Sequence, residues 1–431
     1  MKKIISLSIL FISSISVAAN TGLLFNATVN KPDLTIRPNV NFYYPSAGIK
    51  ITSSRFELQN QGHECTPSSS GFCLFAVSPS QPKTLSITGD GQLTYMLCTN
   101  GDAALNCQNY VADFSPTKAY ISNLRGGADE NGFVSICPLD SNGNITPANC
   151  TDVDRNTWQL VSGVAVWKNT LYVANLEGGN NGDGFVSYCS LSPDGRFTSD
   201  DCTDVLRDQW GNPEGLTVSN NKLYVANMFG VDFPFYGTVS ICSLNPDGSF
   251  TNDCRDVSRG TWREPSDVIV SKNKLYVANQ AGPGDGSFNG FVSICSLDAN
   301  GNFTPENCRD VDRPEWNSPA GVTVSNNKLY IANMGGGTPE TPGFVTICSL
   351  NANGNFTPDN CTDVDRAEWQ SLVGVTVSNN KLYVTDIGDV ETGNRGLVSI
   401  CNLDTNGNFT PANCTDVNKA TWNQPSDIAI K

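Results

Sequence analysis

Short runs of alternating apolar and polar residues follow one another along the chain, and one of them returns several times with small changes. The clearest copy spans 324–333 and reads VSNNKLYIAN. The runs on both sides of its central Asn-Asn pair are rich in β-branched and aromatic residues, which favour strands over helices. The stretch therefore predicts a strand, a tight turn and a second strand. Related copies begin at Val166, Val218, Val270 and Val377, and a shorter one covers 117–123.

Each copy opens a longer unit. The second strand is followed by a variable Gly-rich stretch, a phrase such as GFVSICSL at 290–297, an Asn-Gly or Asp-Gly turn and a second Cys. A Trp comes eight residues after that second Cys, and the first Cys of one unit lies 52 or 53 residues after that of the unit before. Six copies of one supersecondary unit at this period predict the blades of a β-propeller rather than a helical solenoid.

We expect four strands, named a to d, in each unit. In the fourth complete unit they fall at 268–271, 275–279, 290–295 and near 308–311. The Asn-Gly and Asp-Gly pairs between c and d favour hairpin turns, because these residues accept positive φ at little steric cost. A calcium-binding loop is the alternative for the Asp-x-Asn-Gly-Asn turns, but the further acidic ligands of such a loop are missing.

The two ends of the repeat region complement each other. The first unit begins at strand b, 118–123, with no strand a before it, whereas 425–431 reads as a strand a with nothing after it. Pairing of these two segments would close a ring and remove an open sheet edge. We therefore predict an all-β chain in which 114–431 forms a six-bladed β-propeller closed by the C-terminal strand.

Residues 20–113 do not carry the repeat. They contain short strand-like runs separated by Pro, Gly, Ser and Asn, which predict a small β-sandwich-like domain. The stretch 65–77 resembles the loop-and-strand element of bacterial immunoglobulin-like modules. The hairpin 93–111 echoes the later Cys hairpins, so it belongs either to this domain or to the propeller as an extra piece.

The first residues and the cysteines point to export. Two lysines, an apolar run over 4–15 and small residues up to Ala19 are typical of a signal peptide, 1–19, so we expect a secreted or periplasmic chain. Sixteen cysteines then predict eight disulfides. Zinc is the alternative, but zinc sites favour CxxC-type spacing. The expected pairs are Cys65–Cys73, Cys98–Cys107, Cys137–Cys150, Cys189–Cys202, Cys242–Cys254, Cys295–Cys308, Cys348–Cys361 and Cys401–Cys414.

The charge of the chain narrows the range of partners. The formal net charge is −15 and the sequence pI is about 4.5, so the surface repels phosphate backbones and anionic lipid headgroups. We therefore expect no nucleic-acid partner. Beyond the signal peptide, no apolar run is long enough to span a bilayer. A monomer is expected.

Phrases in the repeats resemble a known family. GVTVSNNKLYIAN at 321–333, followed by GFVTI at 343–347, is similar to the YVTN and NHL-type β-propeller repeats, and the resemblance spans 117–431. It implies the propeller fold. That family includes binding scaffolds, surface-layer proteins and some enzymes, so the resemblance implies no single function. The Cys pair and the Trp of each repeat depart from the usual pattern.

The loops between strands b and c vary while the framework repeats, which is typical of a scaffold that presents a binding surface. In a propeller the b–c and d–a connections lie on one face. Exposed aromatic residues favour a protein or sugar ligand, and the loop 228–236 contributes Phe229, Phe233, Phe235 and Tyr236. The six variable loops are 124–131, 176–183, 228–236, 280–289, 334–342 and 387–395.

The repeated Trp has two interpretations. Each indole could line a pocket between blades and stack on a sugar ring. Alternatively it packs the d–a connection against the neighbouring blade, which we favour because Trp buries a large apolar area. The residues are Trp158, Trp210, Trp262, Trp316, Trp369 and Trp422.

Oxygen-bearing side chains recur near the expected mouth of the tunnel, where they could hold calcium. Such a site would resemble that of gluconolactonase and paraoxonase-like six-bladed enzymes. Alternatively each Asn caps the backbone at its turn. The residues at the end of strand b are Asn123, Asn175, Asn227, Asn279, Asn333 and Asp386, and those at the start of strand a are Glu214, Asp267 and Asp427.

The only histidine, His63, lies outside the repeats, which excludes Ser-His-Asp hydrolysis on the propeller. We therefore expect a secreted, non-catalytic module that binds an extracellular protein or a glycan and needs no cofactor. The competing hypothesis is a calcium-dependent, lactonase-like hydrolase. A structural surface protein would differ from the first hypothesis only in lacking a discrete ligand.

Overall fold

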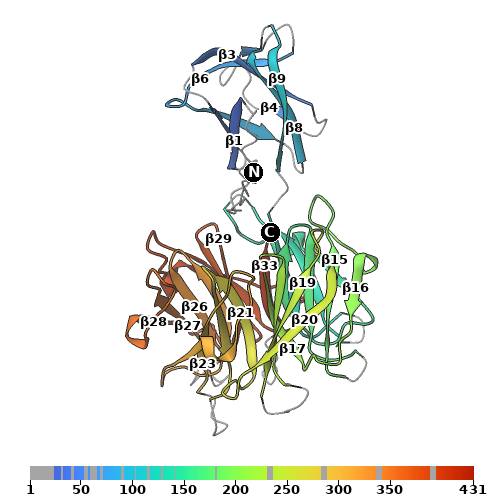
Figure 1. Ribbon diagram of the computed structural model, residues 1–431, viewed down its shortest axis with the longest axis vertical. Helices are drawn as coiled ribbons and strands as arrows, with labels where there is room; N and C mark the ends of the chain where they lie inside the picture. The colour runs from blue at the N-terminus through green and yellow to red at the C-terminus, as the bar shows by residue number, and fades with distance from the viewer. Residues whose placement is uncertain are drawn as a thin grey trace, which may run out of the picture. The chain divides into compact units, whose positions relative to one another are not determined.

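The computed structural model divides into two compact units, Met1–Pro116 and Thr117–Lys431, drawn in blue to cyan and in green to red (Figure 1). None of the helices in the described ranges is both long and apolar enough for a membrane crossing. The structure describes residues 24–30, 33–39, 43–52, 57–58, 66–67, 71–88, 92–101, 103–113, 117–127, 130–140, 142–179, 182–230, 236–282, 289–335, 342–388 and 395–431.

The first unit contains a four-stranded and a five-stranded antiparallel sheet within the described residues. One hydrophobic cluster, which includes Leu34, Ile49 and Tyr95, draws side chains from both sheets. The first sheet has the order β1 (Phe25–Asn30), β2 (Asp33–Pro38), β7 (Lys83–Thr88), β4 (Glu57–Leu58). The second has the order β5 (Thr66–Pro67), β6 (Cys73–Val77), β3 (Tyr44–Ile51), β8 (Gln92–Asn100), β9 (Leu105–Asp113).

The hairpin β8–β9 is therefore part of the first unit, because β8 pairs with β3. Its strands are joined by the disulfide Cys98–Cys107. The expected signal peptide 1–19, Cys65 and His63 lie outside the described residues.

The second unit contains six four-stranded antiparallel sheets in its described residues. Five of them follow the expected a-b-c-d order along the chain. The first two of these sheets consist of β13 (Val161–Trp167), β14 (Thr170–Asn175), β15 (Phe185–Ser190) and β16 (Cys202–Val205), and of β17 (Pro213–Ser219), β18 (Lys222–Asn227), β19 (Thr238–Leu244) and β20 (Phe250–Ser258). The next two consist of β21 (Pro265–Ser271), β22 (Lys274–Asn279), β23 (Phe291–Ser296) and β24 (Cys308–Asp312), and of β25 (Pro319–Ser325), β26 (Lys328–Asn333), β27 (Phe344–Ser349) and β28 (Cys361–Asp365). The fifth consists of β29 (Leu372–Ser378), β30 (Lys381–Asp386), β31 (Leu397–Asn402) and β32 (Cys414–Val417).

The sixth sheet joins the two ends of this unit. Its order is β12 (Thr151–Asp154), β11 (Phe133–Pro138), β10 (Lys118–Asn123), β33 (Pro425–Ile430). Ala119 lies opposite Ile430 in the β10–β33 ladder. The C-terminal strand thus occupies the strand a position of the first repeat.

Local sequence explains the hairpins. Asn220 and Asn221 connect β17 to β18 with φ of 50° and 59°, a conformation that Asn tolerates better than most residues. In the c–d turn, the Asp298 carboxylate accepts the backbone N–H groups of Asn300 and Asn302, and the Asn302 N–H lowers its pKa. Asp298 therefore stabilises the turn by accepting hydrogen bonds from the backbone of the turn.

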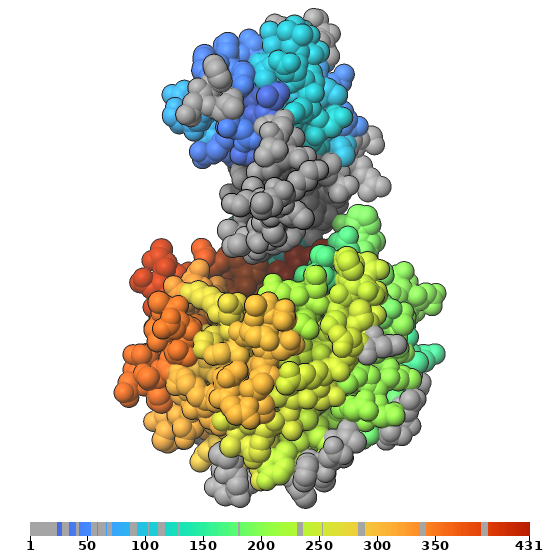
Figure 2. Space-filling model, in the orientation of Figure 1, coloured from blue at the N-terminus to red at the C-terminus, as the bar shows by residue number. Residues whose placement is uncertain are grey.

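The six sheets contact one another in a ring. Their inner strands touch in the order β13, β17, β21, β25, β29, β33 and back to β13, and consecutive sheets lie side by side in the space-filling view (Figure 2). A tyrosine of each strand b donates a hydrogen bond of 2.6–2.7 Å to a glycine carbonyl in the c–d turn of the next sheet. These pairs are Tyr120–Gly195, Tyr172–Gly248, Tyr224–Gly301, Tyr276–Gly354, Tyr330–Gly407 and Tyr383–Gly143.

The disulfides between strands c and d are confirmed in all six sheets. The second Cys follows a short 3₁₀ turn in five of the hairpins: η2 (Pro147–Asn149), η3 (Ser199–Asp201), η4 (Pro305–Asn307), η5 (Pro358–Asn360) and η6 (Pro411–Asn413). The pairs are Cys137–Cys150, Cys189–Cys202, Cys242–Cys254, Cys295–Cys308, Cys348–Cys361 and Cys401–Cys414.

Candidate functional site

The repeated tryptophans are not available to a ligand. All six side chains are 0% exposed, so the sugar-stacking role given to Trp158, Trp210, Trp262, Trp316, Trp369 and Trp422 does not fit the structure. Five indole N–H groups donate to a Ser or Thr hydroxyl, as Trp158 does to Ser187 at 2.9 Å. Among the described residues, the indole N–H of Trp210 has no acceptor. Burial of this kind matches the packing interpretation.

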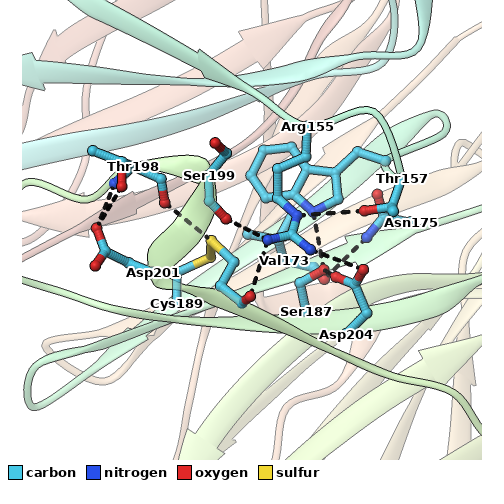
Figure 3. The surroundings of a disulfide bond; sticks show 12 residues. Arg155, Thr157, Val173, Asn175, Ser187, Cys189, Thr198, Ser199, Asp201 and Asp204 are labelled. Carbon is cyan, nitrogen blue, oxygen red and sulfur yellow. Dashed lines mark hydrogen bonds and ion pairs between the residues drawn. A yellow bond between two sulfur atoms is a disulfide. The ribbon is translucent and has the colours of Figure 1, made fainter.

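Five of the tryptophans belong to polar chains that cross between sheets. Ser187 donates to Asp204 at 2.6 Å, and Arg155 of the preceding d–a connection donates to the same carboxylate at 2.9 Å (Figure 3). Arg155 also donates to the carbonyl oxygens of Ser199 and Cys202. The equivalent ion pairs are Arg207–Asp256, Arg259–Asp310, Arg313–Asp363, Arg366–Asp416 and Lys419–Asp152.

The asparagines at the ends of the strands b cap their own backbone. Asn279 donates through Nδ2 to the carbonyl of Val277 at 3.2 Å, and the same contact recurs at Asn123, Asn175, Asn227 and Asn333. All five side chains are fully buried. Within the described residues, the Oδ1 atoms of Asn227, Asn279 and Asn333 accept no hydrogen bond.

Asp386 takes the place of asparagine in the last repeat. Its carboxylate accepts backbone N–H groups from Gln370, Ser371 and Gly388 at 2.8–3.0 Å. Burial raises its pKa, although these three donors act against the shift. Asp386 therefore orders the connections around it rather than offering free oxygens.

Asp267 and Asp427 occupy one equivalent position, the third residue of β21 and β33. Asp267 accepts the N–H of Val322, on the next inner strand, at 2.8 Å, and Asp427 likewise accepts the N–H of Val164 at 2.9 Å. The other four inner strands carry glycine here. At one of these, Gly215, an added Cβ would lie 2.4 Å from Asp267 Oδ1. Each aspartate thus bridges two neighbouring sheets.

Glu214, the second residue of β17, is the third buried acid. Its Oε1 accepts from Gln280 Nε2 at 3.2 Å, while its buried Oε2 has no hydrogen-bond partner among the described residues. Burial, with the nearby charges of Glu264 and Asp427, raises the pKa of Glu214 to about 8. Burial also raises the pKa of Asp427 to about 6, and burial and Asp427 together raise that of Asp267.

These acids do not fit a calcium ion as they are placed. Calcium is held by six to eight oxygen ligands, but no group of three acidic, histidine or cysteine side chains in the described ranges lies close enough to hold a metal. Both oxygens of Asp267 and of Asp427 accept backbone N–H groups. Asn227, Asn279 and Asn333 cap their own strands through Nδ2, and the Oδ1 atom of each accepts no hydrogen bond from the described residues.

The aromatic loop is only partly described. Phe233 and Phe235 lie outside the described residues. Phe229 is half-buried, and its N–H donates to the carbonyl of Gly211 at 3.0 Å. Tyr236 is also half-buried, and the Arg263 guanidinium lies 4.7 Å from the centre of its ring.

The b–c and d–a connections meet on one face of every sheet, as expected. The residue after each strand b donates its N–H to the carbonyl of the residue before strand a of the same sheet, at 3.0–3.2 Å. We call this set the mouth ring. Its pairs are Leu124–Gln424, Leu176–Leu160, Met228–Asn212, Gln280–Glu264, Met334–Ser318 and Ile387–Ser371.

A pocket of about 460 Å³ lies in the mouth ring where the first two repeats meet. Its walls are the side chains of Leu124, Leu160 and Leu176, with Arg125 and Gln424. The variable loops 124–131 and 176–183 were expected on this face, but Leu160 and Gln424 were not among the candidate residues. An alignment of the six repeats points to the pocket, because the second repeat is the one in which both mouth-ring residues, Leu160 and Leu176, are apolar.

Comparisons with known proteins bear on the fold. No protein-family model matches the chain, and no curated protein matches its sequence. A solved chain from a nidogen–laminin complex is 14% identical and has a TM-score of 0.51, with 73% of this chain and 98% of that chain covered.

Two further solved structures are less similar. A putative 6-phosphogluconolactonase from Bacteroides fragilis is 12% identical with a TM-score of 0.45, with 74% of this chain and 98% of that chain covered. A hypothetical selenium-binding protein from Sulfolobus tokodaii is 10% identical with a TM-score of 0.48, with 73% and 93% covered. The nidogen–laminin likeness and the ring of sheets show a β-propeller repeat fold, and at this identity they show the fold alone.

Proposed function

We propose that this chain is an exported, non-catalytic binding module whose mouth ring and adjoining loops contact an extracellular protein or a glycan. The observation that supports this is the contrast within the mouth ring. All six pairs keep one backbone hydrogen bond, yet their side chains range from leucine and methionine to glutamate and serine. A constant framework that carries different side chains on one face is typical of a binding surface.

The finer architecture belongs to the same proposal. The six sheets are six blades, and β33 closes the ring by completing the first blade. The tyrosine contacts between sheets support this, since Tyr383 of the last repeat bonds to Gly143 of the first. The disulfides fit an oxidising compartment, and with the signal-like segment 1–19 they support secretion.

A calcium-dependent, lactonase-like hydrolase is the competing proposal. It needs Glu214, Asp267 and Asp427 to hold a cation together, but the oxygens of the two aspartates already accept backbone hydrogen bonds. Calorimetric titration of the oxidised chain with calcium separates the two proposals. Micromolar binding that Glu214→Gln abolishes would support the hydrolase, because Glu214 Oε2 is the acidic oxygen of this set without a hydrogen-bond partner among the described residues.

The binding proposal is tested by probing arrays of extracellular proteins and glycans with the oxidised chain. A variant that carries Met228→Glu and Met334→Glu alters the mouth ring, and Asn220→Asp alters an exposed a–b turn at the other end of a sheet. We expect the first variant to weaken a positive interaction by at least about tenfold and the second to leave it unchanged. If both variants bind as tightly as the unmodified chain, the functional surface lies outside the mouth ring.

A further inference from the structure

The leucines of the mouth-ring pocket are not core residues. Leu124, Leu160 and Leu176 are half-buried, and the hydrophobic clusters found in the described residues contain none of them. Leu171 of the same repeat, by contrast, is fully buried in a cluster. Three neighbouring leucines that pack into no core form an apolar surface available to a partner.

Leu160 also has an unfavourable backbone conformation. Its φ is +52°, a region that polar residues such as Asn adopt more readily than leucine. The equivalent residues with positive φ in four other repeats are Asn212, Glu264, Ser318 and Gln424. The framework therefore imposes this conformation in five of the six repeats. The unusual feature of the second repeat is the leucine, which is costly in this conformation and gains no place in a hydrophobic cluster.

A positive charge stands at the edge of the same pocket. Arg125 is exposed, lines the pocket and forms no ion pair with any described residue. At the equivalent position the next two repeats have Glu177 and Phe229, and none of the other five has a basic residue. On a chain with a net charge of −15, an unpaired guanidinium beside an apolar wall favours a ligand with a carboxylate.

We propose that this pocket anchors a protein partner through an aliphatic side chain followed by an aspartate or glutamate. The aliphatic group contacts the three leucines, the carboxylate pairs with Arg125, and the Gln424 amide donates to a backbone carbonyl of the partner. The residues that line the pocket include no aromatic side chain on which a sugar ring could stack. Within the proposed function, on which this inference rests, the pocket therefore favours a protein over a glycan. The volume suits one anchor residue with its flanking backbone.

The test is a titration of the full oxidised chain, labelled at its leucine methyl groups, with short blocked peptides, followed by NMR. The peptide GSLDSG should shift the methyl signals of Leu124, Leu160 and Leu176 saturably. GSLKSG, which reverses the charge, should bind at least about fivefold more weakly. GSSDSG, which lacks the aliphatic group, should produce no saturable shift.

Two variants copy residues from other repeats, so they should fold. Leu160→Asn installs the residue found at 212 and should abolish GSLDSG binding without lowering the melting temperature. Arg125→Glu installs the residue found at 177 and should reverse the preference, so that GSLKSG binds more tightly than GSLDSG. Asn220→Asp, in an exposed a–b turn at the other end of a sheet, is the control and should leave GSLDSG binding unchanged.

Absence of saturable shifts, or equal affinity for all three peptides, would overturn the proposal. Hexanoate binding as tightly as GSLDSG would overturn it too, because the pocket would then take a small carboxylate. The proposed function is tested separately, by the binding of the chain to the arrays of extracellular proteins and glycans. A protein interaction that Met228→Glu with Met334→Glu disrupts but Leu160→Asn does not would retain the binding module and reject this pocket as its anchor.

Discussion

The buried carboxyl of Glu214 gives the protein a specific pH dependence. Its pKa is raised to about 8 in the folded chain from an ordinary value of 4.5. Between these values the folded state holds a proton that the unfolded state has lost, so stability decreases as the pH rises. The loss is complete above about pH 8.

Glu214→Gln should remove this contribution. The unfolding equilibrium constant of the unmodified chain should increase by up to about tenfold per pH unit relative to that of the variant, between about pH 5 and pH 8. Urea unfolding at pH 5, 7 and 9, with the disulfides intact, measures the difference. The exposed Glu177→Gln is the control, and parallel pH profiles for all three proteins would contradict the argument.

At the level of single residues, the sequence located the acids but not their role. Glu214, Asp267 and Asp427 were predicted near one end of the inner strands, as candidate calcium ligands in the competing hypothesis. The N–H groups that Asp267 and Asp427 accept belong to the next inner strand, and no pattern within one repeat shows that neighbour. The available signal was the third position of these strands, which is Asp in two of them and Gly in the other four.

The tyrosine of each strand b contributes to stability as a link between elements. Tyr276 Oη donates to the Gly354 carbonyl at 2.7 Å and is fully buried. Tyr276→Phe should lower the free energy of unfolding by about 1–2 kcal/mol, because the carbonyl loses its donor in a buried place. Denaturant unfolding measures this loss.

A matched control is Tyr188→Phe, which changes a half-buried tyrosine outside this set of contacts. Tyr188→Phe should lower the free energy of unfolding by less than half as much as Tyr276→Phe does. Equal losses for the two variants would mean that the hydroxyl contact with the next sheet contributes nothing specific.

The c–d disulfides make a larger contribution. Cys295 and Cys308 are bonded across a sequence separation of 13 residues. Replacing both with alanine should lower the free energy of unfolding by about 3 kcal/mol, since the unfolded chain regains the entropy of an open loop. Thermal unfolding under non-reducing conditions checks this. Reduction should then lower the stability of the unmodified chain by more than that of the variant. Equal losses on reduction would mean that the Cys295–Cys308 bond contributes nothing.

Strands and disulfides were predictable because they are local. The alternation of residues fixed the hairpins, and the two cysteines of a hairpin lie opposite each other in the ladder, as Cys295 and Cys308 do. The tyrosine–glycine hydrogen bonds between sheets were not predicted. Tyr276 and Gly354 lie 78 residues apart, and a glycine whose carbonyl accepts a hydrogen bond looks in the sequence like any other turn glycine.

Ring closure is a property of the whole second unit. Three kinds of contact join its last repeat to its first: the β10–β33 ladder, the Tyr383–Gly143 hydrogen bond and the Lys419–Asp152 ion pair. The complementary ends of the repeat region predicted the first of these. The same closed framework says little about the ligand, because a propeller supports many functions on one scaffold.

Removal of 425–431 tests whether closure holds the whole unit together. The deletion leaves the edge of β10 unpaired, with the buried Ala119 and Ile121 beside it. Free strand edges pair with other chains, so the truncated protein should form oligomers in size-exclusion chromatography and unfold at a lower denaturant concentration. Lys431→Ala keeps the two backbone hydrogen bonds between residue 431 and Lys118, so it is the control and should change neither property. A synthetic peptide of the deleted sequence should restore the monomer by adding the missing strand, whereas a truncated chain that stays monomeric and equally stable would show that the ring does not depend on its closing strand.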